Sequence, residues 1–152
     1  LKVLISYPAR EEELLIVRQN LAGTKLPEIK PVVSSIEVLQ ARDLVRQIYM
    51  DEKIENYILD IVFATREPSQ FRLDKLKPLI AYGGSPRASI NLALAAKAHA
   101  FINKRGYVVP EDVRNIAKDV LRHRIGLTYE AEAENINAEN VVDEVLRAVN
   151  VP

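Results

Sequence analysis

The chain has 152 residues, of which 48% are hydrophobic and 28% charged, with a formal net charge of +0, two histidines and no cysteine. This composition suits one folded domain, or a small domain with appendages, and excludes disulfide frameworks, thiolate sites and histidine metal sites. The balanced charge offers no electrostatic basis for binding nucleic acid or an acidic membrane surface. No apolar run reaches membrane-spanning length and the first residues show no signal peptide, so we expect a cytoplasmic domain without a membrane span.

The first residues combine a strand pattern with a helix pattern. Residues 2–6 are a short apolar run typical of an interior strand of a parallel sheet, yet no second strand of that kind follows. We therefore expect the chain to begin within a larger protein; a disordered or crystal-paired arm is the alternative. Residues 10–21 are predicted to be helical, because acids occupy the first turn and apolar residues recur at helical spacing.

Two prolines and a glycine mark residues 22–31 as a linker, the one candidate domain boundary. The next helix is predicted to begin after Ser34, because Ser34 and Glu37 have the spacing of a capping box. Asp51 is expected to cap a further helix that continues to about residue 66. The core side of the first of these helices is expected to comprise Ile36, Leu39, Leu44, Val45 and Ile48.

The segment 67–82 is polar and contains two prolines, so we predict a loop, either functional or a solvated connector. Gly83 and Gly84 then break the chain before a helix that Ser85 is predicted to cap and Pro86 to begin. Residues 88–102 have almost no polar side, which predicts a helix buried all round at the centre of the fold.

The second half follows similar local signals. Gly106 is predicted to end the central helix in the left-handed conformation, and Pro110 to begin the next helix, to about residue 122. Asn137 is predicted to cap the last helix. Brief extended pieces are expected at 48–50, 107–109 and 125–129, and a flexible acidic segment at 131–135. The predicted fold class is mainly α: a bundle of four or five main helices, preceded by a strand and one extra helix.

Arg87 is the candidate functional residue, because it places a cation in the first turn of the central helix. A cation there opposes the helix dipole, whereas the free amides at that end suit an anion. An arginine beside them adds a planar fork that can bind two phosphate oxygens. The functional interpretation is a phosphate contact; the alternative, which local features alone favour, is an arginine that points outward into water.

The residues identify no self-sufficient active site. The sequence contains no phosphate-binding loop, no strand ending in paired acids for magnesium, no zinc signature and no nucleophile elbow. His99 is expected to be a core histidine with its hydrogen bonds satisfied. A free-standing helical module that binds a protein or nucleic acid is a second hypothesis, and its binding cations would be Lys104, Arg105, Arg122 and Arg124.

Five segments carry a family resemblance. The central segment is Gly83-Gly84-Ser85-Pro86-Arg87-Ala88, and the others are Tyr7-Pro8 followed by Glu11-Glu12-Glu13, Ala64-Thr65-Arg66, Gly106 to Val113, and Val120-Leu121-Arg122-His123-Arg124. In this order and spacing they resemble the C-terminal part of a MoxR-type AAA+ ATPase, over nearly the whole chain. The family's Gly-Ala-Ser-Pro-Arg-Ala motif has alanine where this chain has Gly84. Magnesium-chelatase ATPase subunits have a similar lid and are the neighbouring alternative.

The resemblance implies an AAA+ lid in which Arg87 is the sensor 2 arginine and reaches toward the ATP γ-phosphate. Ser85 and Pro86 would contribute to the nucleotide site, and Tyr7 and Pro8 at the core–lid junction would lie near the adenine. The implied domains are the end of the ATPase core (1–22), a linker (23–33) and the helical lid (34–152).

The resemblance also implies cofactors and partners. ATP and Mg²⁺ would serve the parent protein, with neither bound tightly by this chain alone. The phosphate loop, magnesium acid, sensor 1 and arginine finger would lie upstream of Leu1, so this chain is not expected to hydrolyse ATP. The expected partners are the upstream ATPase core, further copies in a hexameric ring and an unidentified client protein, in a chaperone-like remodelling machine.

Overall fold

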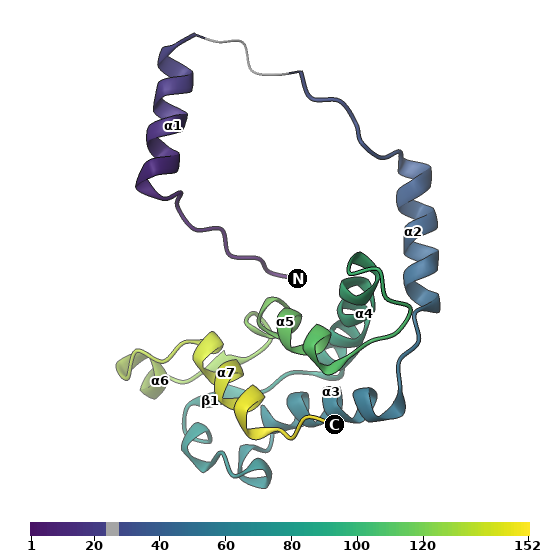
Figure 1. Cartoon of the computed structure of the whole chain (residues 1–152). Coiled ribbons are helices and arrows are strands. Elements are labelled where there is room, and N and C mark those ends of the chain that lie inside the picture. The colour runs from purple at the N-terminus through teal and green to yellow at the C-terminus, as the bar shows by residue number, and fades with distance from the viewer. Residues whose placement is uncertain (24–27) are drawn as a thin grey trace.

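The computed structural model describes residues 1–23 and 28–152. Helices dominate it, which confirms the mainly α fold class (Figure 1). The helices are α1 (Arg10–Leu21), α2 (Ser35–Gln47), α3 (Glu52–Ala64), α4 (Pro86–Ile102), α5 (Pro110–Leu121), α6 (Tyr129–Ala133) and α7 (Ala138–Ala148). Two short 3-10 helices, η1 (Pro68–Phe71) and η2 (Asp74–Leu76), and two strands, β1 (Ile80–Tyr82) and β2 (Gly126–Leu127), lie between them. Over the described ranges, no helix is long and apolar enough to cross a membrane.

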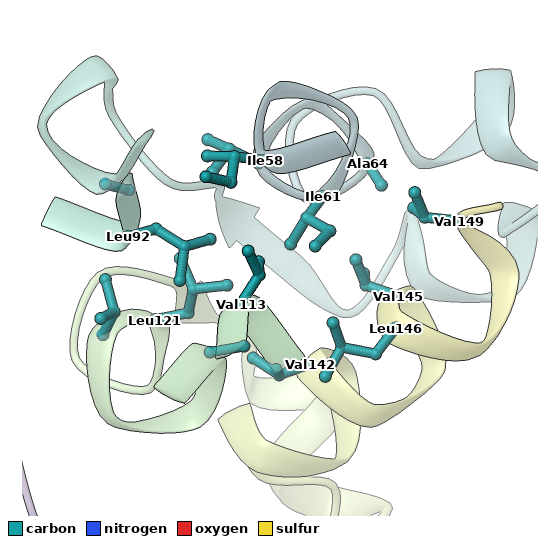
Figure 2. Close-up of a cluster of buried hydrophobic side chains, with 14 of the residues drawn as sticks. Ile58, Ile61, Ala64, Leu92, Val113, Leu121, Val142, Val145, Leu146 and Val149 are labelled. Carbon is teal, nitrogen blue, oxygen red and sulfur yellow. The ribbon is translucent and has the colours of Figure 1, made fainter. Parts of the chain in front are cut away.

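Helices α3, α4, α5 and α7 pack around one hydrophobic core. Figure 2 shows side chains from all four converging, among them Ile61 of α3, Leu92 of α4, Val113 of α5 and Val145 of α7. Each of these four side chains is fully buried. Removal of this apolar surface from water is the main favourable term for the bundle.

Helix α4 is buried along one side only, so the expectation of a helix buried all round is wrong in part. Ala88, Leu92, Ala96 and Ala100 are each 0% exposed, and their spacing of four residues places them in one row. The alanines allow α5 to approach closely. Ile90 is 58% exposed, because no described element packs over that side of the helix.

The expected strand at residues 2–6 does not form. A strand needs a neighbouring strand to pair its backbone groups, and these residues have none among the described elements. Their contact with the bundle is at Lys2, whose N–H donates to the Asp119 carbonyl oxygen and whose carbonyl oxygen accepts from Arg122. Helix α1 forms with the predicted bounds, but it has no buried residue and stands apart from the bundle (Figure 1).

The predicted core side of α2 is also wrong, because this helix has no buried residue. Ile36, Leu39 and Leu44 are each at least half exposed. The first buried residue of this region is Ile48, which follows the end of the helix. The apolar residues do have helical spacing, and Val45 is half-buried where the end of α2 contacts α4, but Ile36, Leu39 and Leu44 are left largely uncovered. Residues 24–27 of the expected linker lie outside the described residues.

Local capping signals predict the helix starts correctly. The Ser34 hydroxyl accepts from the Glu37 N–H at 3.2 Å, and the Glu37 carboxylate accepts from the Ser34 N–H at 2.7 Å. Asp51 and Asn137 cap α3 and α7 through their side-chain oxygens. These bonds join residues at most three apart, so they can be inferred without knowledge of the tertiary fold.

Two segments that we expected to be irregular contain regular elements. Segment 67–82 contains η1, η2 and β1, and β1 pairs antiparallel with β2. Much of segment 131–135 belongs to α6, which the Thr128 hydroxyl caps and in which Ala131 is completely buried. The expected extended pieces near 48–50 and 107–109 do pair, through a parallel bridge between Tyr49 and Tyr107.

Helix α4 ends in a left-handed residue, but that residue is Lys104 rather than the predicted Gly106. Lys104 has a φ of 58°. The Lys104 N–H donates to the Phe101 carbonyl oxygen at 2.9 Å, and the Arg105 N–H donates to the Ala100 carbonyl oxygen at 3.0 Å. These two bonds define a Schellman motif that is complete before Gly106.

Gly106→Ala is therefore expected to be neutral, or stabilising by up to about 1 kcal/mol. Gly106 does not have a positive φ, and a Cβ built there meets no atom within 4 Å. Alanine fits without strain and has fewer unfolded conformations to lose. Urea unfolding followed by circular dichroism measures the change. Destabilisation by more than about 1 kcal/mol would contradict this account of the helix end.

Candidate functional site

The turn before α4 is held against the end of α3. The Gly84 N–H donates to the Thr65 hydroxyl at 2.9 Å, and Arg66 Nε donates to the Gly84 carbonyl oxygen. At Gly83 the two backbones approach so closely that a Cβ would lie 2.4 Å from the Thr65 carbonyl oxygen. A glycine is therefore required at position 83 for close backbone packing, in addition to ending the preceding segment.

Helix α4 begins at Pro86, as predicted, but Ser85 caps it differently. The Ser85 backbone is extended, with a ψ of 171°, and its side chain makes no capping bond. The Ser85 carbonyl oxygen instead accepts from the Ala88 N–H at 2.7 Å. The Ser85 hydroxyl is consequently exposed and is not used by the helix.

Arg87 is the second residue of α4 and its side chain is exposed. Its carbonyl oxygen accepts from the Asn91 amide at 2.6 Å, whereas its guanidinium has no hydrogen-bond or ion-pair partner among residues 1–23 and 28–152. Three other arginines of the bundle, Arg105, Arg122 and Arg147, do pair with acids, for example Arg147 with Glu144 at 2.6 Å. An unpaired guanidinium beside the positive end of a helix dipole leaves its donors available to an external anion.

Tyr7 and Pro8 are not brought to Arg87. Tyr7 is 97% exposed, so it packs against nothing in the described chain. Both residues lie just before α1, the helix that Figure 1 shows apart from the bundle. The predicted position of these residues near the adenine stays a prediction.

Two of the four cations of the second hypothesis are paired with acids within the fold. Arg105 binds the buried carboxylate of Asp112, and Arg122 pairs with Asp119 at 2.9 Å and with Glu139 at 3.1 Å. Lys104 occupies the left-handed position that ends α4. A guanidinium already paired with carboxylates is a weak phosphate ligand, which weakens the case for Arg105 and Arg122. Lys104 and Arg124 form no ion pair in the described ranges, and the Arg124 Nε is buried.

Asp112 is the centre of a polar network that the sequence did not predict. It is 0% exposed, and its carboxylate accepts from Arg105, from His99 Nδ1 at 2.7 Å and from the Val109 N–H at 2.9 Å. Burial by itself raises the pKa of Asp112, but the hydrogen bonds from Arg105, Val109 and His99 outweigh it and lower the pKa to about 2. His99 is thus a satisfied histidine, as expected. The sequence signal for this network is that Asp112 lies three residues after Val109, the spacing at which an acid can accept from the N–H of the residue before a helix.

The described residues fit a phosphate contact better than a metal site. No group of three or more histidine, cysteine, aspartate or glutamate side chains is placed to hold a metal ion in the described ranges. A cleft of about 860 Å³ lies between residues 72–79 and 134–147, and it does not include residues 83–88. Arg87 could donate to an ATP phosphate, whereas ligands for Mg²⁺ would have to come from outside these residues.

Comparisons with known proteins match this chain to a lid-domain model and to parts of longer proteins. A model of the AAA lid domain matches residues 75–145. The chain is 36% identical to the chaperone MoxR1 of Mycobacterium tuberculosis over 151 residues, which are 99% of this chain and 40% of that protein. It is 34% identical to YeaC of Bacillus subtilis, again over 99% of this chain and 44% of the relative.

A solved structure is similar to nearly the whole chain. A protein from Cytophaga hutchinsonii, described as an ATPase, is 40% identical to this chain and superposes with a TM-score of 0.91. The match covers 97% of this chain and 45% of that one. The chain therefore spans less than half the length of each of these three relatives.

Proposed function

The chain is the C-terminal lid part of a MoxR-family AAA+ ATPase, and from this membership we propose that Arg87 is the sensor 2 arginine of the parent enzyme. The family implies ATP and Mg²⁺ as cofactors of that parent. The observation that carries the proposal is the exposed, unpaired guanidinium in the first turn of α4. Arg87 would donate to the γ-phosphate from the lid side of the nucleotide.

The proposed role follows from the charge that develops in phosphoryl transfer. Negative charge spreads over the phosphate oxygens, and a positioned guanidinium stabilises it. The lid carries this cation, so its orientation relative to the core would depend on whether a γ-phosphate is present. Ser85, with its unused hydroxyl, and Pro86 would line the same site. Tyr7 and Pro8 would approach the adenine only in the context of the core.

For the parent protein we propose the assembly that the family resemblance implies. The lid would pack on the upstream ATPase core, several copies would form a ring, and the ring would remodel an unidentified client protein. The end of the core would then be residues 1–22, the linker residues 23–33 and the lid residues 34–152. Exposed apolar residues on α1 and α2, such as Leu15 and Leu39, are consistent with cover supplied by the core.

The test is Arg87→Ala in the full-length ATPase. ATP turnover is expected to fall by roughly tenfold or more, because a hydrogen bond between charged groups contributes about 1.5–3 kcal/mol. Initial rates of phosphate release measure the effect. Arg147→Ala is the matched control, because it removes an exposed arginine that pairs with Glu144 on α7. Equal turnover in wild type and Arg87→Ala would refute the sensor 2 assignment.

A further inference from the structure

The Gly84 backbone is held on both of its polar groups by two consecutive residues at the end of α3. The Thr65 hydroxyl accepts from the Gly84 N–H, and Arg66 Nε donates to the Gly84 carbonyl oxygen. We call these two bonds the Gly84 anchor. The bonded residues are 18 and 19 positions apart in the sequence, so the anchor ties the start of α4 to a distant helix end.

The Thr65 side chain is buried, and its hydroxyl both donates and accepts a hydrogen bond. Its side chain is 0% exposed, and its hydroxyl also donates to the Val62 carbonyl oxygen at 2.6 Å. The hydroxyl therefore uses its proton on α3 and its lone pair on Gly84. Serine could make both bonds, whereas valine has nearly the same shape and can make neither.

Arg66 completes the anchor from the solvent side. Its guanidinium carbon lies 4.8 Å from the centroid of the Phe63 ring, a cation–π contact that fixes the direction of the side chain. Arg66 is half-buried and forms no ion pair with an acid in the described ranges. Its bond to Gly84 is therefore its main polar contact within the chain.

We propose that Thr65 and Arg66 are positioning residues that orient the first turn of α4 and thereby aim Arg87. The inference rests on the proposed function of Arg87. Arg87 lies three residues after Gly84; between them the Ser85 backbone is extended, and the ring of Pro86 fixes its φ. A shift of the anchored turn would move the Arg87 guanidinium with it, and displacements near 1 Å at a reacting group can cost up to about a hundredfold in rate.

The experiment compares Thr65→Val and Thr65→Ser in the full-length ATPase, each with and without Arg87→Ala. Thr65→Val is expected to lower kcat roughly tenfold, and Thr65→Ser to retain most of the wild-type kcat. Once Arg87 is alanine, Thr65→Val should cause no further loss, because there is no guanidinium left to aim. A loss from Thr65→Val that is just as large in the Arg87→Ala protein would overturn the inference, since Thr65 would then act independently of Arg87.

Hydrogen exchange detects the anchor without reference to catalysis. In the full-length protein, peptides that contain Gly84 should exchange faster in Thr65→Val than in wild type or Thr65→Ser. Unchanged exchange would overturn the anchor itself. If Arg87→Ala leaves turnover unchanged while Thr65→Val still speeds exchange, the sensor 2 assignment fails but the anchor stands.

Arg66→Met provides a second variant in case Thr65→Val does not fold. Methionine keeps an unbranched apolar stem near Phe63 and removes the donor to Gly84. Arg66→Met is again expected to lower kcat. In the Arg87→Ala background it should cause no further loss of kcat. An additional loss in that background would mean that Arg66 contacts the nucleotide directly, and would overturn its assignment as a positioning residue.

Discussion

Asp112→Ala is expected to lower the free energy of unfolding by about 3–5 kcal/mol, the range for breaking a buried ion pair. Alanine leaves the Val109 N–H without its acceptor and removes the common partner of Arg105 and His99. The Arg105 side chain is 27% exposed and can turn partly to water, which favours the lower end of the range. Thermal melting should show a midpoint lower by roughly 10 °C.

The matched control is Asp143→Ala, which breaks an ion pair at 2.8 Å between Asp143 of α7 and Lys118 of α5. Both side chains of that pair are 37% exposed, so the loss is expected to be at most about 1 kcal/mol. Similar melting temperatures for the two variants would show that the Asp112 network does not stabilise the bundle.

The Asp112 effect also has a defined pH dependence. The pKa of Asp112 is lowered from 3.8 to about 2 in the folded chain, so the unfolded chain takes up the proton first as the pH falls. The stabilisation, roughly 2 kcal/mol, is complete above about pH 4 and is lost as the pH falls through about 2. The stability difference between wild type and Asp112→Asn should shrink over that window in urea titrations. A difference that is constant from pH 6 to pH 2 would exclude the ionised carboxylate as its source.

Gly83→Ala is expected to destabilise the start of α4 and to reduce ATP turnover in the full-length ATPase. The added Cβ would lie 2.4 Å from the Thr65 carbonyl oxygen and 2.8 Å from the Arg66 backbone nitrogen. Backbone atoms cannot rotate away as a side chain does, so the turn must separate from α3. The expected loss of stability is about 1–3 kcal/mol or more, with turnover reduced because the Gly84 bonds lengthen.

Gly84→Ala tests whether any side chain added to this turn is destabilising, or only one at position 83. A Cβ on Gly84 would lie 3.1 Å from the Ala88 Cβ and 3.3 Å from Val62 Cγ1, contacts that a small adjustment relieves. The loss is expected to be below about 1.5 kcal/mol, in keeping with the alanine that the family motif has at this position. Equal destabilisation by the two substitutions, measured by urea unfolding, would contradict this reading of the turn.

The candidate site was predictable where it depended on neighbours in sequence. Arg87 could be found because Gly83, Gly84 and Pro86 mark a helix start and because the motif resembles that of a known family. The sequence pattern marks Thr65 only as part of a segment that resembles the family, and it does not indicate the bond from Gly84 to Thr65. Nothing local to residue 65 identifies a partner 19 positions away.

The sequence by itself determined the helical class and most helix starts, because caps such as Ser34 with Glu37 and Asn137 with Asn140 form between residues three apart. Tertiary structure alone decided which apolar sides are buried and which extended segments pair. Residues 2–6 have a strand pattern without a described partner strand, whereas α6 forms because the bundle buries Ala131. The physical reason is that a cap is a contact within one turn, whereas burial and strand pairing depend on surfaces that distant segments supply.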